Sequence, residues 1–265
     1  MRETPQKSLK NNLEIQRTVW VLSPENWGAM RLSKHHYATA LAELGWSVYY
    51  INPPNDAATE ITVREDAASK VKVVDHAFNF PYRLKFHARW AFDLLLKRHI
   101  RKLLRHLDIP DLVWSFDIGG LYNLAHFPPG TKKIAFAADF CQSDFTVQNS
   151  IRNADLLVSV APEILNAYPS QTIKKKLVPH GVSEIFLNTK FTAKSVNRES
   201  IHVGLSGNFL RPDIDFQTLL KIINKNPTCH FHFFGTYKKQ HSNIGGGDNT
   251  EVLQSISDLM ACTNT

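Results

Sequence analysis

The stretch TVWVLSPENWGAMRLSKHHYATALAELGWSVYYINPP, residues 18–54, begins with a short apolar run and ends with a second one at 47–52. Between the two runs, residues 33–45 carry small and apolar side chains at helical spacing, with Ser33 as a candidate N-cap and Gly45 as the stop. A strand, a helix and a second strand in this order predict a β-α-β unit, in which the two strands run parallel in one sheet.

The same alternation continues along the first two thirds of the chain. Further apolar, strand-like runs occupy residues 70–76, 111–116, 133–138, 155–160 and 175–179. Helical patterns separate most of these runs. Continuous apolar strands alternating with helices are typical of a parallel sheet that is covered on both faces. We therefore predict an α/β fold, with one Rossmann-like domain over residues 18–187 after an N-terminal tail at 1–17.

A second unit is predicted after a polar linker at residues 188–199. Within 200–265, strand patterns at 201–208 and 229–235 flank a helical pattern at 212–227. This order is the opening of a second, incomplete Rossmann-like domain. So few elements cannot cover both faces of a parallel sheet. We therefore expect an uncovered apolar face and self-association, the face being formed by Val203, Leu205, Phe231 and Phe233.

Composition narrows the class of protein. The chain has 265 residues, of which 43% are apolar, so a folded core is expected. Its three cysteines, Cys141, Cys229 and Cys262, are widely spaced, which predicts a reducing compartment and neither a disulfide framework nor a structural zinc site. The N-terminus shows no signal-peptide pattern, and no stretch approaches the ~20 apolar residues that span a bilayer. These features predict a cytoplasmic protein.

The net charge of +7 suggests an anionic partner. Much of this charge lies in an amphipathic basic helix predicted at residues 85–107, where Arg98, Arg101, Lys102 and Arg105 lie opposite an apolar stripe. One interpretation is peripheral contact with an anionic membrane, and the other is an ordinary solvated outer helix. The basic helix also suggests an alternative function that involves no catalysis. In this alternative the chain is a binding module that contacts a membrane or a partner through the helix. The sequence contains no nucleic-acid-binding motif, so we expect no nucleic acid as partner.

Three segments carry a resemblance to a known family. SKHHYATALAELGWSVYYINPP (33–54), ADLLVSVAPEILNAYP (154–169) with KKKLVPHGVSEIF (174–186), and HVGLSGNFLRPDIDFQTLL (202–220) are similar, in order and spacing, to GT-B glycosyltransferases of the family-4-like, group 1 type. The resemblance implies an enzyme that transfers a sugar from a nucleotide-diphosphate sugar to a glycan or lipid-linked acceptor. It also implies retention of configuration, no cofactor, no metal, and a role in surface polysaccharide or glycoconjugate biosynthesis at the inner face of the cell membrane.

The candidate acceptor-side residues lie where predicted strands end or a predicted helix begins. His35 and His36 fall in the first turn of a helix, where free amides favour an anionic group, although both can equally be solvent-exposed residues of the capping region. Asp117 and Asp139 each follow a strand, at the edge where parallel sheets bind ligands. Asp139 is the candidate catalytic residue, to orient or deprotonate the acceptor hydroxyl, and helix capping is the alternative.

The Pro-His-Gly turn at residues 179–181 ends the last strand of the first domain, because Pro179 lacks the amide hydrogen that would continue the ladder. The resemblance places His180 at the mouth of the interdomain cleft, where relatives usually carry Asn. The family often has a His at the position of Ala138, and this difference weakens the transfer of a catalytic role to Asp139.

The donor-binding candidates lie at the ends of the two strands of the second unit. Gly207 permits close approach of a diphosphate to the backbone, and Asn208 and Arg211 follow it. The resemblance implies that Arg211 contacts the donor phosphates and that the nucleoside lies near Phe234 and Gly235. The family's glutamate pair would fall beyond residue 265, so we expect weak donor binding and no sugar transfer by this chain alone.

Two further patterns are predicted to be structural. Asp213 and Asp215 open a helix, which Asp213 is expected to cap while Asp215 suits the helix dipole, although Asp-x-Asp is a metal-diphosphate signature in a different glycosyltransferase fold. His230 and His232 lie on one face of a strand and are expected to be a surface pair, since the sequence shows no third metal ligand nearby.

Overall fold

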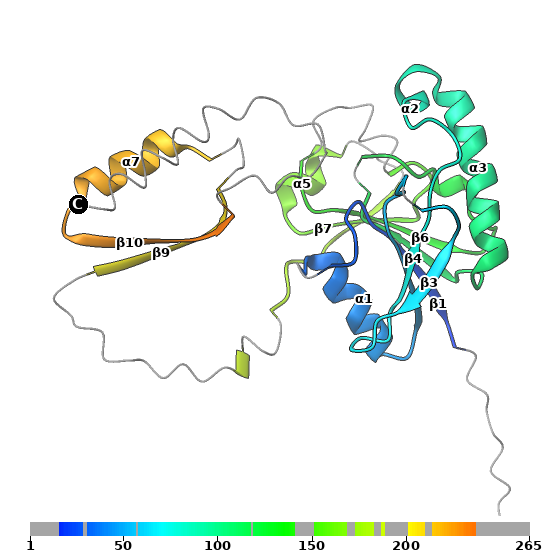
Figure 1. Cartoon of the computed structure of the whole chain (residues 1–265), viewed down its shortest axis with the longest axis horizontal. Coiled ribbons are helices and arrows are strands. Elements are labelled where there is room, and N and C mark those ends of the chain that lie inside the picture. The colour runs from blue at the N-terminus through cyan, green and yellow to red at the C-terminus, as the bar shows by residue number, and fades with distance from the viewer. Residues whose placement is uncertain are drawn as a thin grey trace, which may run out of the picture. The chain divides into compact units, whose positions relative to one another are not determined.

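The computed structural model describes residues 16–28, 31–56, 58–117, 119–140, 151–168, 173–182, 187–188, 201–209 and 214–236. The chain divides into two compact units, residues 1–183 and 184–265, and each is described by itself (Figure 1). The predicted boundary at residue 187 lies a few positions further along. Arg211, Asp213, Cys141 and Cys262 lie outside the described residues.

The first unit is built on one sheet, whose described strands follow the order β3-β4-β2-β1-β5-β6-β7-β8. The strands are β1 (Thr18–Leu22), β2 (Ser47–Ile51), β3 (Thr62–Glu65), β4 (Lys72–Asp75), β5 (Leu112–Ser115), β6 (Lys132–Ala137), β7 (Leu156–Ser159) and β8 (Lys174–Leu177). All neighbouring pairs are parallel except β3 with β4. This arrangement confirms the predicted α/β class and every strand predicted in this unit.

One strand was not predicted from the sequence. β3 pairs antiparallel with β4, with Thr62 opposite Asp75 and Glu65 opposite Lys72. All four of its residues are exposed, so it lacks the apolar run that identifies the buried strands. Polar edge strands of this kind carry little periodic signal, because backbone hydrogen bonds and surface ion pairs, here Arg64 with Asp75 at 3.7 Å, hold them in the sheet without an apolar face.

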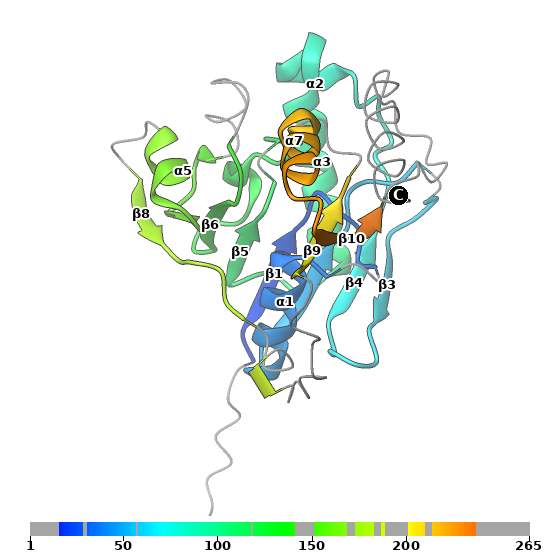
Figure 2. The same ribbon diagram turned by 90° about the vertical axis from the view of Figure 1, so that its left-hand side faces the viewer.

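Helices cover both faces of this sheet (Figure 2). The helices among the described residues of this unit are α1 (Ser33–Glu43), α2 (Leu84–His87), α3 (Arg89–His106), the 3-10 helix η1 (Leu124–His126) and α5 (Pro162–Ala167). Along β1 the side chains alternate, so that Val19 and Val21 pack in the core beneath α1, and Trp20 and Leu22 pack in the core beneath α3. Full burial of this strand on both faces explains its continuous apolar sequence.

The basic helix differs from the single helix predicted at residues 85–107. It is broken at Ala88, whose φ of −143° and ψ of 65° are not helical, so that α2 and α3 are separate. Hydrophobic periodicity does not detect a break of this kind, because the spacing of apolar side chains runs through it.

The start of α1 also differs from the prediction. The residue at the N-cap is Leu32, not Ser33, and its backbone N–H donates to Nδ1 of His35 at 3.0 Å. The predicted stop is confirmed: Gly45 has a φ of +88°, and Trp46 N–H donates back to Leu41 O at 3.0 Å. This is a Schellman-type helix end, which favours glycine because the left-handed conformation strains other residues.

The second unit contains a parallel pair of strands, β9 (Ile201–Asn208) and β10 (Cys229–Thr236), joined by α7 (Phe216–Lys225). The N-cap of α7 is Asp215 and not Asp213 as predicted: the Asp215 carboxylate accepts from Thr218 N–H at 2.9 Å. The uncovered apolar face is a wrong prediction, because Leu205, Phe231 and Phe233 pack against the core that α7 closes. No helix in the described part of the chain is long and apolar enough to cross a membrane.

Candidate functional site

The candidate site lies along the carboxyl edge of the first unit's sheet. β1 has β2 on one side and β5 on the other, so the strand order reverses direction between β1 and β5. In open α/β sheets, ligands bind in the crevice outside the carboxyl ends of the strands at such a reversal. The segments that meet this edge are the loop after β1, the first turn of α1, and the residues that follow β5 and β6.

The loop after β1 is held down on the sheet by polar side chains. Ser23 Oγ and Tyr50 Oη are 2.7 Å apart, and Tyr50 Oη donates to Glu25 O at 3.0 Å. The Trp27 backbone N–H donates to Asn52 Oδ1 at 2.8 Å. Burial raises the pKa of Tyr50 to about 12, so its phenol stays protonated and donates. This loop is therefore positioned by side chains at the ends of β1 and β2.

His35 takes part in the same network. Its ring is 1% exposed, stacks on Tyr50 at 5.1 Å between centroids, and accepts from Leu32 N–H through Nδ1. The proton must then be on Nε2, which lies 3.2 Å from Asn26 O. Burial lowers the pKa of His35, which keeps the ring neutral. These contacts give His35 a role in holding the loop, and no described atom of its ring is left for a ligand. His36, the next residue, is exposed.

Lys34 is the functional candidate that the sequence did not reveal. Its side chain is only 11% exposed and forms an ion pair with Glu25. Burial lowers the pKa of Lys34 to about 8, while the negative charge of Asp139 acts in the opposite direction. A lysine in the first turn of a helix opposes the helix dipole, and this unfavourable position is the signal that could have identified it.

Asp139 lies two residues beyond the end of β6, is exposed, and is close enough to Lys34 to influence its charge. A solvent-accessible carboxylate beside a partly buried ammonium group can accept a proton from an incoming hydroxyl. The capping role predicted as the alternative involves residues after 140, which lie outside the described residues. The structure thus brings together Asp139, Lys34 and Glu25 at one edge.

Asp117 has a different environment from Asp139. It is 8% exposed, and its carboxylate accepts from the backbone N–H groups of Leu121 and Tyr122, the latter at 3.0 Å. Burial raises the pKa of Asp117. A Cβ on Gly119 would come within 3.1 Å of its Oδ1. Asp117 therefore organises the turn that follows β5, and its role toward an acceptor stays a prediction.

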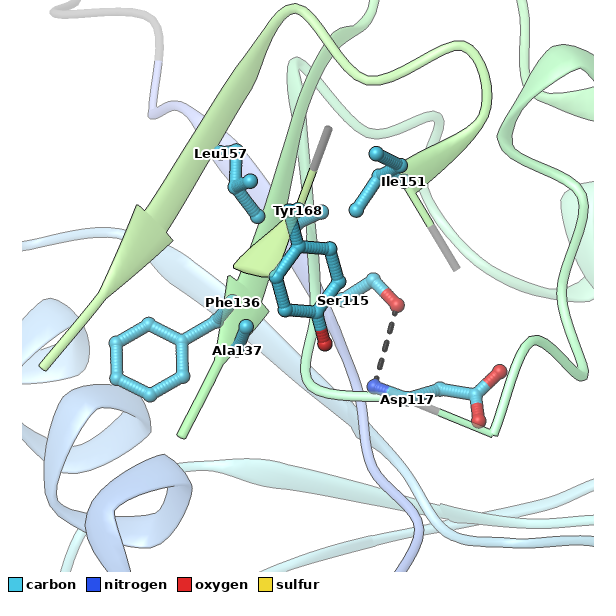
Figure 3. Close-up of a pocket in the computed structure, with 8 residues that line it drawn as sticks. Ser115, Asp117, Phe136, Ala137, Ile151, Leu157 and Tyr168 are labelled. Atoms are coloured by element: carbon cyan, nitrogen blue, oxygen red, sulfur yellow. Dashed lines mark hydrogen bonds between the residues drawn. The ribbon is translucent and has the colours of Figure 1, made fainter. Parts of the chain in front are cut away.

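A narrow gap lies behind Asp117, between the ends of β5, β6 and β7 (Figure 3). Its lining residues are Ser115, Asp117, Ala135, Phe136, Ala137, Ile151, Leu157 and Tyr168. Ser115 Oγ accepts from Asp117 N–H at 3.3 Å, as the dashed line in Figure 3 shows. Since the gap is too narrow for a water molecule, it reflects packing of the core and not a substrate cavity.

His180 lies at the same edge but near the margin of the sheet. Val178 N–H still donates to Ser159 O at 2.8 Å, one residue beyond β8, and Pro179 then ends the ladder. His180 is exposed. β8 is two strands from β6, about 10 Å at the usual strand spacing, so the sheet does not place His180 directly beside Asp139.

In the second unit, the predicted donor residues lie at the carboxyl ends of β9 and β10. Gly207 is in register with Gly235, and Asn208 with Thr236. Gly235 has a φ of +144°, and a Cβ there would overlap the carbonyl of Gly207, so this position requires glycine. A Cβ on Gly207 would have no atom of the described residues within 4 Å apart from its chain neighbours, so the space beside its backbone is open. Phe234 is 61% exposed next to these glycines.

The exposed face of this strand pair carries three histidines where the sequence showed only two. His202 is in register with His230, and its Nδ1 lies 2.8 Å from Nε2 of His232. His202 was missed because it lies far from the other two in the sequence and approaches them only through strand pairing. Within the residues that the structure describes, no group of three or more His, Cys, Asp or Glu side chains could hold a metal ion.

No family model matches this sequence, and no curated protein matches it significantly. Solved structures do match. Sucrose-phosphate synthase from Thermosynechococcus elongatus is 12% identical with a TM-score of 0.62, over 94% of this chain and 68% of that chain. The E. coli trehalose-6-phosphate structure bound with UDP-2-fluoro glucose is 10% identical with a TM-score of 0.56, over 93% and 70%. The catalytic domain of starch synthase IV from Arabidopsis thaliana, bound to ADP and acarbose, is 12% identical with a TM-score of 0.55, over 92% and 71%.

These likenesses extend over both units and show that the chain has the GT-B fold, as its sequence predicts. At such low identity they establish the fold alone.

Proposed function

We propose that this chain, with its GT-B fold, belongs to an enzyme that transfers a sugar from a nucleotide-diphosphate sugar to a glycan or lipid-linked acceptor. The observation that carries the proposal is the match over more than nine tenths of the chain to synthases, two of which hold a nucleotide or a nucleotide-sugar analogue. The arrangement at the carboxyl edges of both sheets supports it, because parallel sheets bind phosphorylated ligands there.

In this proposal, Asp139 orients or deprotonates the acceptor hydroxyl. Lys34 offers a positive charge close to Asp139, and its side chain is largely shielded from solvent. Glu25 fixes the Lys34 side chain. On the donor side, the departing diphosphate would approach the open backbone at Gly207, and Arg211 would supply a positive charge. Retention of configuration and metal-independent transfer belong to the proposal by resemblance.

Nucleoside diphosphate binding tests the donor side directly. Because we expect weak binding, saturation-transfer NMR with UDP, ADP and GDP is suited to it, with inorganic phosphate as the reference anion. We expect saturable binding of at least one nucleotide, weakened about tenfold by Arg211→Gln, the loss of one charge-assisted contact. Arg98→Gln removes the same charge from an exposed helix position and serves as the matched control. No saturable signal from any nucleotide, or equal losses in both variants, would contradict the proposal.

We also propose an anionic membrane surface as a partner, through Arg98, Arg101, Lys102 and Arg105 of α3. Three of these side chains are exposed and Lys102 is partly exposed. A cytoplasmic protein acting at the inner face of the membrane on a lipid-linked acceptor would use such a contact.

A further inference from the structure

Four large apolar side chains are exposed on α2, the turn before it and the first half of α3. We define this apolar patch as Tyr82 (44% exposed), Phe86 (70%), Trp90 (77%) and Leu94 (48%). The rings of Tyr82 and Phe86 are in contact, edge to face, at 5.9 Å between centroids. Trp90 and Leu94 are one turn apart on α3 and so share a face. Single exposed apolar residues are common on soluble proteins, but four within thirteen residues indicate a binding surface.

The buried face of α3 shows that the patch is not a misplaced part of the core. Phe92, Leu96, Ile100 and Leu103 are at most 1% exposed and pack on the sheet. Trp90 and Leu94 point away from this face and have no described apolar partner in the core. Figures 1 and 2 both show α2 at the outer end of α3, at the margin of the unit. The patch is thus additional apolar surface on a helix that is already fully packed.

The segment that carries the patch is rich in positive charge. Between residues 82 and 106 the sequence contains eight Lys and Arg residues, namely Arg83, Lys85, Arg89, Lys97, Arg98, Arg101, Lys102 and Arg105. The one acidic residue in this range is Asp93. Its carboxylate accepts a hydrogen bond from Asn123 Nδ2 at 2.9 Å and lies 3.0 Å from Nε2 of His126. On α3, Arg98 and Arg101 follow Leu94 at spacings of four and seven residues, so the exposed face is apolar near its N-terminus and cationic toward its C-terminus.

The patch is tied to the carboxyl edge of the sheet. Lys85 Nζ donates to Gly119 O at 2.6 Å, and Arg89 donates to Gly120 O at 2.9 Å. Both carbonyls belong to the turn that Asp117 organises after β5. The N-terminal, apolar end of the helix pair therefore lies beside the edge that carries the candidate acceptor site.

We propose that Tyr82, Phe86, Trp90 and Leu94 insert into the interfacial region of an anionic lipid bilayer, with the cations of α3 lying on the headgroups. Aromatic side chains favour this region because their rings are apolar and their edges tolerate water. Insertion of the apolar end turns the carboxyl edge of the sheet toward the lipid, where a lipid-linked acceptor is presented. The inference deepens the proposed membrane contact and does not depend on sugar transfer.

Sedimentation with vesicles tests the patch. The probe is the full chain with vesicles of equimolar phosphatidylcholine and phosphatidylglycerol, compared with pure phosphatidylcholine. We expect binding to the anionic vesicles and a loss of about 30-fold in the partition coefficient for the double variant Phe86→Ser, Trp90→Ser, from the apolar area withdrawn from lipid. Leu44→Ser removes an equally exposed apolar side chain (76%) outside the patch and should bind as the parent does. Circular dichroism should show the parent fold in all three proteins, since the altered side chains are exposed.

Two further variants separate insertion from charge attraction. Trp90→Phe replaces one large aromatic side chain with another, so the variant should sediment like the parent. It lacks the Trp90 indole, so it should lose most of the quenching of tryptophan fluorescence by brominated lipid. The triple variant Arg98→Glu, Arg101→Glu, Arg105→Glu should lose binding with the patch intact.

If the serine double variant binds vesicles as well as the parent does, or if the parent does not bind them, the proposal is wrong. A second outcome would also overturn the proposal. If the serine double variant loses binding to a single-stranded oligonucleotide while its binding to vesicles is unchanged, the patch is a nucleic-acid-binding surface. Nucleotide binding by the second unit is measured separately and is unaffected by any of these outcomes.

Discussion

Three consecutive residues at the start of α1 have three different environments. Lys34 is largely buried and ion-paired with Glu25, His35 is buried with both ring nitrogens in contact with protein groups, and His36 is exposed. All three are polar and helical, so the hydrophobic periodicity of the sequence does not separate them. Their difference arises from the loop that β1 and β2 hold over the first turn of the helix.

At the residue scale, Asp139 is expected to affect turnover and not stability. Because its carboxylate is exposed, Asp139→Asn should leave the melting temperature unchanged. In a catalytically competent form of the protein it should lower kcat by about 10²-fold, the usual contribution of a general base. Glycosyl transfer assays and thermal melts on the same preparations measure both quantities. A large drop in melting temperature with normal turnover would instead identify a structural cap.

Asp117 is expected to behave in the opposite way. Asp117→Ala leaves the backbone N–H groups of Leu121 and Tyr122 without their acceptor in a buried turn. The free energy of unfolding should fall by about 3 kcal/mol, the cost of leaving such groups unpaired. Urea denaturation measures this, with Asp139→Ala as the exposed control at a neighbouring strand end. Equal stability of the two variants would contradict the structural role of Asp117.

At the scale of elements, a buried histidine pair joins α3 to the strands beneath it. His99 of α3 lies with its Nε2 3.0 Å from Nδ1 of His76, which follows β4. The other nitrogen of His76 lies 3.0 Å from Asn52 O, beyond the end of β2, and 3.3 Å from Tyr122 Oη. Burial lowers the pKa of His76 to about 4 and that of His99 to about 3, so both rings are neutral at pH 7.

This pair predicts an acid-sensitive stability. In the unfolded chain both histidines take up protons below about pH 6.5, whereas the folded protein binds none until near pH 4. The free energy of unfolding should therefore fall as the pH drops from 6.5 to 4, by about 3 kcal/mol for His76. Urea melts between pH 7.5 and 4.5 measure the slope.

His99→Gln removes one titrating group while its amide can still donate to His76, so the slope over this range should become shallower. The control is His36→Gln, which alters an exposed histidine of α1 and should leave the slope unchanged. Identical slopes in the parent and the His99 variant would show that the pair does not govern acid stability.

At the scale of the whole molecule, the two units have very different cores. The first unit buries residues on both faces of its sheet, in three clusters. In the described part of the second unit the core has three buried members, Phe209, Phe216 and Ile223, each still 7–8% exposed. The five tryptophans, Trp20, Trp27, Trp46, Trp90 and Trp114, all belong to the first unit. A smaller core buries less apolar surface and so gives less stability.

The second unit should therefore unfold first. Tryptophan fluorescence reports only the first unit, whereas far-ultraviolet circular dichroism reports helices and strands of both. We expect the circular dichroism transition in urea to begin at lower denaturant concentration than the fluorescence transition, a departure from two-state behaviour. Adding a nucleotide that binds the second unit should bring the two curves closer together. Coincident curves would show that the units unfold as one.

The sequence by itself determined the α/β class, the buried parallel strands and the stop of α1 at Gly45, because each depends on local periodicity or local backbone chemistry. It also determined the GT-B fold, through motifs whose order spans both units. Tertiary structure decided the remainder. β3 is recruited by backbone pairing and the surface ion pair of Arg64 with Asp75, and the break at Ala88 interrupts an unbroken apolar pattern. Pairing across the sheet decides which polar side chains meet: it buries Asp117, leaves Asp139 exposed beside Lys34, and brings His202 to His232, since residues far apart in sequence become neighbours only when strands and helices pack.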